Sequence, residues 1–103
     1  MGSSREDIQR FPEEARRRAG YQLRRVQHGL MPDDWKPMAS VGGGVREIRI
    51  HAGTEHRVFY VAKFEEGIYV LHAFEKRTGR TRQANIDLAK RRLAIVLAWR
   101  AKE

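Results

Sequence analysis

The chain has 103 residues, no cysteine, and 21 Lys and Arg against 13 Asp and Glu, which gives a formal net charge of +8. This length fits one domain over residues 1–103, and the absence of cysteine excludes disulfides, cysteine nucleophiles and thiolate metal sites. No apolar run approaches the roughly 20 residues of a membrane span, and the charged N-terminus is unlike a secretory signal, so we expect a cytoplasmic protein without membrane contact. The Arg-rich excess favours a polyanionic partner, first of all nucleic acid, although an ordinary protein can also be this basic.

Two helices are expected before the first strand. Ser4 is placed to cap a short helix over residues 4–10, and Pro12 suits the start of a second helix that reaches about His28. Apolar residues at helical spacing give the second helix a buried stripe, namely Ala15, Ala19, Leu23 and Val26. The arginines around that stripe form either a solvated face or a partner-binding surface. Residues 29–44 read as a loop, and its three consecutive glycines precede a strand, which argues against a phosphate-binding loop.

Three strands are expected over residues 45–51, 56–64 and 68–76, joined by turns at 52–55 and 65–67. Short turns imply antiparallel neighbours. In the first strand, alternation separates Ile48 and Ile50 from Glu47, Arg49 and His51, which point to the opposite face. The second and third strands lack clean alternation, so both faces of the sheet should be covered.

A final helix is expected over residues 84–101. Ile86, Leu93 and Leu97 share one face of it, Ala89 and Val96 flank that face, and Lys90, Arg91 and Arg92 point outward by default. The expected fold is therefore a small α+β domain: an N-terminal helical pair, an antiparallel central sheet of three or more strands, and a C-terminal helix.

The available chemistry is narrow. The four histidines lack metal-ligand spacing and the serines lack a nucleophile-elbow context, so neither a metal site nor a cofactor is expected. What remains is a concentration of cations on and beside the sheet: Arg49, Arg57, Lys63, Lys76 and Arg77. RNA can be cleaved by attack of its own 2′-OH on the adjacent phosphorus, and fixed cations stabilise the charge that develops on the phosphoryl oxygens. Each cation taken alone could equally serve a strand edge or a salt bridge.

Several segments resemble the RelE/ParE toxin superfamily, in particular its phage-derived HigB-like branch. They are GSSREDIQRFPEE, PDDWKPM, GGGVREIRI, RVFYVAKF and IYVLHAFEKRTGRT, and the resemblance covers nearly the whole chain. It implies a RelE-like toxin of a type II toxin–antitoxin pair that enters the ribosomal A site, cuts mRNA, and is neutralised by a cognate helix-turn-helix antitoxin. The residues matched to catalytic positions are Arg49, Arg57, Lys76 and Arg77. Further cations expected to bind RNA are Arg46, Lys63, Arg80 and Arg82.

Two departures from the family pattern leave alternatives open. Better-studied relatives carry a Tyr, or an Asp/Tyr/His group, near the C-terminus, where this chain has only Trp99 as an aromatic residue. His72 and Lys63 are candidate proton-transfer groups, and a structural role for His72 is the alternative. The usual N-terminal strand is absent or short, which would leave a sheet edge exposed or covered by a partner. Because the ParE branch poisons DNA gyrase, a gyrase inhibitor and a degenerate protein that only binds RNA or antitoxin also remain possible.

Overall fold

Three helices and one four-stranded antiparallel sheet make up the described part of the chain, residues 2–76 and 83–102, in this computed structural model. The elements are α1 (Gly2–Gln9), α2 (Glu13–Gln27), β1 (Trp35–Pro37), β2 (Val45–Ala52), β3 (Thr54–Phe64), β4 (Gly67–Lys76) and α3 (Gln83–Ala101). The expected α+β fold is confirmed. None of the helices in these two ranges has the length and apolar character needed to cross a bilayer.

The sheet has the strand order β1-β2-β3-β4, and all neighbours are antiparallel. Both expected turns are present: Gly53, with φ of 75°, joins β2 to β3, and Gly67, with φ of 131°, follows the turn into β4. Only glycine adopts these positive φ values readily. The sequence expectation of a plain loop over residues 29–44 is wrong at β1, which pairs with β2 as an edge strand. Three residues that include a proline are too short to carry a strand periodicity.

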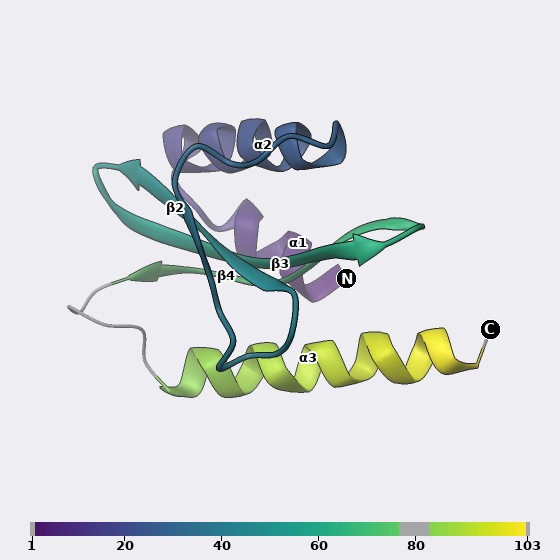
Figure 1. Cartoon of the computed structure of the whole chain (residues 1–103). Helices are drawn as coiled ribbons and strands as arrows, with labels where there is room; N and C mark the ends of the chain where they lie inside the picture. Colours follow the sequence, from purple (N-terminus) through teal and green to yellow (C-terminus); the bar gives the residue numbers. More distant parts are fainter. Residues whose placement is uncertain (1, 77–82, 103) are drawn as a thin grey trace.

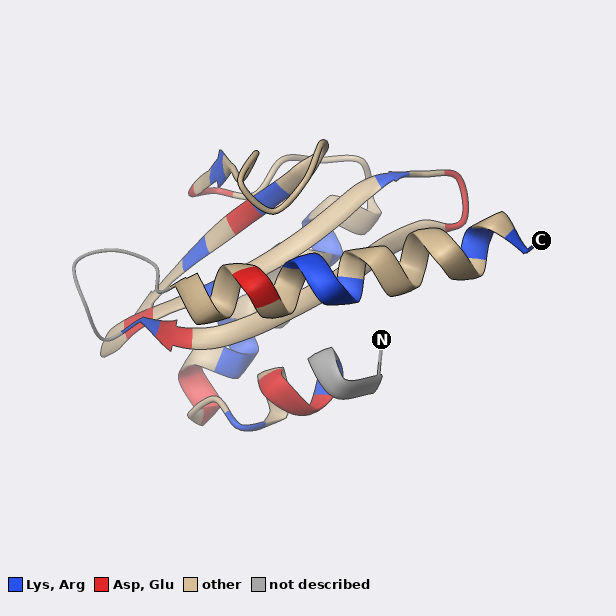
Figure 2. Cartoon of the chain, turned by 90° about the horizontal axis from the view of Figure 1, so that it is seen from below, with Lys and Arg blue, Asp and Glu red and all other residues tan. Residues whose placement is uncertain are grey.

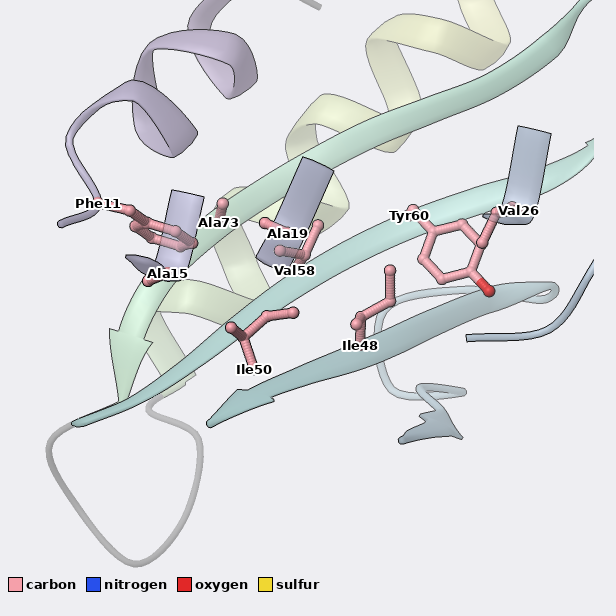
Figure 3. Packing of buried hydrophobic residues seen from close by; sticks show 9 residues of the cluster. All are labelled: Phe11, Ala15, Ala19, Val26, Ile48, Ile50, Val58, Tyr60 and Ala73. Carbon is pink, nitrogen blue, oxygen red and sulfur yellow. The ribbon is translucent and has the colours of Figure 1, made fainter. Parts of the chain in front are cut away.

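Helices cover both faces of the sheet (Figure 1): α2 packs on one face and α3 on the other, while α1 packs against β4. The α2 side of the core is shown in Figure 3, where Ile48, Ile50, Val58 and Tyr60 from the strands meet Ala15, Ala19 and Val26 from α2. On the α3 side, Phe59, Val61 and Leu71 meet residues of the last helix. Residues 56–61 of β3 are therefore buried without interruption, which confirms that both faces are covered.

The helices differ from expectation in three details. α1 begins at Gly2, so Ser4 lies inside the helix and not at its cap. Leu97 is 43% exposed, because the buried stripe of α3 is Ala89, Leu93 and Val96. Arg92 does not point outward: its Nη1 donates to Asp7 Oδ2 (2.8 Å) and to the Leu71 carbonyl (2.9 Å), since α3 packs beside β4 and α1. The stripe expected on α2 is confirmed.

Tyr60 offers a test of the packing on the α2 side. Its side chain is fully buried, and its hydroxyl has no hydrogen-bond partner among the described residues (Figure 3). Removing a hydroxyl that has lost water without gaining a partner should raise stability, so we expect Tyr60→Phe to increase the free energy of unfolding by about 1 kcal/mol. Urea denaturation measures this change. Tyr69→Phe is the control, because the Tyr69 hydroxyl donates to Glu66 (2.8 Å) and its removal should bring no gain.

Candidate functional site

Arg49 and Arg57 lie directly opposite each other on β2 and β3. Their side chains share the sheet face of Val45 and Phe59, which pack toward α3. Both guanidinium groups approach one carboxylate: Arg49 Nε and Arg57 Nε each lie 3.5 Å from Glu47 Oε1. The fold therefore brings together two of the four cations predicted to be catalytic, with a carboxylate between them.

Burial separates the two arginines. The Arg49 side chain is 35% exposed, whereas those of Arg57 and Glu47 are 7% and 1% exposed. Arg57 Nη1 donates to the His56 carbonyl (3.2 Å), and its Nε has an ion-pair distance to Glu47 without the geometry of a hydrogen bond. Arg49 is thus the cation open to an incoming anion. Arg57 is the buried cation, and it shares the carboxylate of Glu47 with Arg49.

Lys76, the third predicted catalytic residue that is described, lies on the same face at the end of β4. Its Cα partner is Glu55, and Phe74 is the partner of Arg57, so Lys76 is a diagonal neighbour of Arg57. Diagonal neighbours in an antiparallel pair are about 7–8 Å apart, which lies within reach of a lysine side chain. Arg77, Arg80 and Arg82 lie outside the described residues.

The other two cations predicted to bind RNA lie elsewhere. Arg46 is on the α2 side of β2, where its guanidinium stacks 4.9 Å from the ring centre of Trp35. Lys63 is six residues further along β3 than Arg57, roughly 20 Å away by strand geometry, and it donates to the Gly43 carbonyl (3.0 Å). The structure therefore groups Arg49, Arg57 and Lys76 and separates Arg46 and Lys63 from them.

His51 extends the cluster at the end of β2. Its Nε2 lies 2.7 Å from Asp34 Oδ2 and its Nδ1 lies 2.9 Å from Glu55 Oε1, while Asp34 Oδ1 is 3.8 Å from Arg49. The hydrogen bond with Asp34 and then that with Glu55 raise the pKa of His51 above its usual value. Among the described residues, no group of three or more His, Asp or Glu side chains is arranged to hold a metal ion. The cluster combines three cationic side chains and His51 with three carboxylates, and Figure 2 shows acidic and basic positions interspersed along the strands.

The His51 contacts predict a pH dependence of stability. Because the folded-state pKa is raised, the contribution of His51 is fully present below its unfolded pKa, near 6.5, and is lost as the pH rises through the higher folded value. We expect His51→Gln to reduce stability at pH 6 and to have much less effect at pH 9. Urea denaturation of both proteins across this window measures the difference, and an equal loss at both pH values would contradict the assignment.

His72 is held in a buried network and not on an open surface. Its Nδ1 lies 3.1 Å from Asp7 Oδ2 and its Nε2 lies 2.8 Å from Asn85 Oδ1, and its ring stacks on Phe74. The residue is 7% exposed. Both ring nitrogens are therefore engaged in joining α1, β4 and α3, which favours the structural alternative for His72.

The acidic partners of the cluster were not singled out from the sequence. Glu47 carried a usable signal, because alternation places it on the same face as Val45 and Arg49, and a carboxylate on a buried face requires cations. Asp34 carried no such signal in the sequence, since it belongs to the loop before β1 and contacts His51 only in the folded structure.

The family of the chain follows from comparison with known proteins. A family model described as phage-derived protein Gp49-like (DUF891) matches residues 6–94, which is most of the chain and includes β2, β3 and β4. No curated protein matches it significantly. The chain therefore belongs to the phage-derived Gp49-like family, a RelE/ParE-like family that is associated with the toxins of toxin–antitoxin pairs and implies an antitoxin partner.

Proposed function

We propose that this protein is a HigB-like toxin that cleaves mRNA in the ribosomal A site without a metal ion, and that a helix-turn-helix antitoxin neutralises it. The observation that carries the proposal is the pairing of Arg49 and Arg57 around Glu47. Two guanidinium groups approach one carboxylate there, and Asp34 Oδ1 lies 3.8 Å from Arg49, beyond hydrogen-bond distance, so a phosphate can replace these long contacts at Arg49. Arg49 has the exposure needed to meet it.

The proposed reaction is an internal transesterification. The 2′-hydroxyl of one nucleotide gives its proton to water as its oxygen bonds to the adjacent phosphorus. The bond to the 5′-oxygen of the next nucleotide breaks, and that oxygen takes a proton from water, so the products are a 2′,3′-cyclic phosphate and a 5′-hydroxyl end. The phosphoryl oxygens gain negative charge in the transition state, and Arg49 and Lys76 stabilise that charge more than they stabilise the bound substrate. Arg57 acts as a positioning residue, because its charge keeps Glu47 from neutralising Arg49 fully.

Induction in growing cells tests the proposal. We expect growth arrest and new mRNA 5′ ends within translated regions, mapped by sequencing RNA ends before and after induction. Blocking translation initiation should remove the cuts, because the substrate is mRNA held on ribosomes. Arrest without new RNA ends, together with loss of DNA supercoiling by gyrase, would instead identify a gyrase inhibitor and overturn the nuclease proposal.

A further inference from the structure

A second concave site lies directly beside the arginine cluster. It has a volume of about 470 Å³, within the usual range of ligand pockets. Its lining comes from α2, the following loop and the edge of β2, and comprises Arg17, Arg18, Tyr21, Gln22, Asp33, Asp34, Arg49, Ile50 and His51. Arg49 belongs both to this pocket and to the cluster around Glu47, so the two sites adjoin at this residue.

The pocket exists because β1 is short. β1 pairs with β2 only as far as Ile48, and beyond that point the edge of β2 is held by single contacts. Arg49 N–H donates to the Asp34 carbonyl (2.9 Å), and Arg18 Nη1 donates to the His51 carbonyl (2.5 Å). The space between α2 and this edge is therefore spanned by side chains and not filled by another strand.

Most polar groups of the lining already have partners. Gln22 and Asp33 exchange two hydrogen bonds of 2.7 and 2.9 Å, which tie α2 to the loop. Arg17 pairs with Glu13 (3.2 Å), and Arg18 pairs with Glu14 (2.8 Å). Tyr21 differs from them, since this aromatic residue of the pocket lining is 55% exposed.

We infer that this pocket binds a base of single-stranded RNA, stacked on Tyr21, when the adjoining phosphate lies on Arg49. The inference rests on the proposed function for the nature of the ligand. An exposed tyrosine ring next to a phosphate-binding arginine is the usual combination for single-stranded nucleic acid, because stacking tolerates any base and the arginine holds the backbone. Tyr21 then positions the strand on the nuclease and takes no part in the chemistry.

Binding of 2′-O-methyl RNA hexamers to the full chain tests the inference, because the blocked 2′-oxygen prevents cleavage and separates binding from catalysis. Fluorescence anisotropy at low salt gives the Kd. We expect Tyr21→Ala to raise the Kd about 5- to 150-fold, the range seen for loss of one stacking contact, and Tyr21→Phe to retain affinity. Trp99→Ala is the matched control, since Trp99 is also 55% exposed but lies on α3, outside the pocket.

The outcomes distinguish this inference from the proposed function. If Tyr21→Ala leaves the Kd unchanged, or if the wild type binds no hexamer, the base pocket is overturned whether or not the protein cleaves mRNA on ribosomes. If Tyr21→Ala weakens binding in a protein that makes no cuts, the nuclease proposal fails and the base pocket stands. Weaker binding of a hexamer with an abasic site, with no further loss in Tyr21→Ala, would support stacking directly.

Discussion

Arg49→Ala is expected to lower the rate of mRNA cleavage on ribosomes by about 10²–10³, the usual effect of removing one group that stabilises charge in a transition state. The fold should tolerate the change, because the Arg49 side chain is 35% exposed and Glu47 keeps Arg57 as its partner. Single-turnover cleavage of a labelled mRNA bound to ribosomes measures the rate.

Two further variants show whether the loss comes from phosphate recognition. Arg49→Lys keeps the charge but loses the planar fork that fits a phosphate, so we expect an intermediate rate. Lys63→Ala removes a cation from the same strand, β3, but at a distance from Arg57, and its rate should stay close to wild type. Equal rates for wild type and Arg49→Ala would show that the scissile phosphate does not rest on this side chain.

The sheet was predictable from the sequence because its signals are local. Strands of 8 to 11 residues rich in β-branched and aromatic residues, joined by turns that contain Gly53 and Gly67, fix both the antiparallel pairing and the faces. The same alternation correctly put Glu47, Arg49 and His51 on one face. β1 escaped prediction because three residues have no periodicity and gain strand geometry only by pairing with β2.

The sequence could not predict the acidic partners of the site or the burial of its arginines, because both depend on contacts between segments that are distant along the chain. Asp34 meets His51, and Asp7 meets His72 and Arg92, only because the loop before β1 and α1 are folded against the sheet. Residue type and the family resemblance singled out Arg49 and Arg57, but they could not tell that the two lie opposite each other, or that one is exposed and the other buried. Burial depends on packing across layers, which no single segment encodes.

Glu47→Gln should be the most destabilising single change in the cluster. The carboxylate is 1% exposed, and neutralising it leaves the buried guanidinium of Arg57 without its counter-charge. Breaking a buried pair in this way typically removes about 3–5 kcal/mol from the free energy of unfolding. That is a large share of the total for a domain of this size, about 5–15 kcal/mol. Urea denaturation at pH 7 measures the loss, with Glu66→Gln as the control, because Glu66 pairs with Arg100 at the surface and its removal should change stability little.

The double variant Glu47→Leu with Arg57→Met separates the structural role of this pair from its catalytic one. Apolar side chains of similar size can replace a buried ion pair with little loss, so the double variant should recover most of the stability that Glu47→Gln loses. Cleavage should stay close to the wild-type rate, because Glu47 is removed together with the cation that offsets it, and Arg49 keeps its charge for the phosphate. A stable double variant that cleaves much more slowly than wild type would mean that Arg57 itself stabilises the phosphate and is more than a positioning residue.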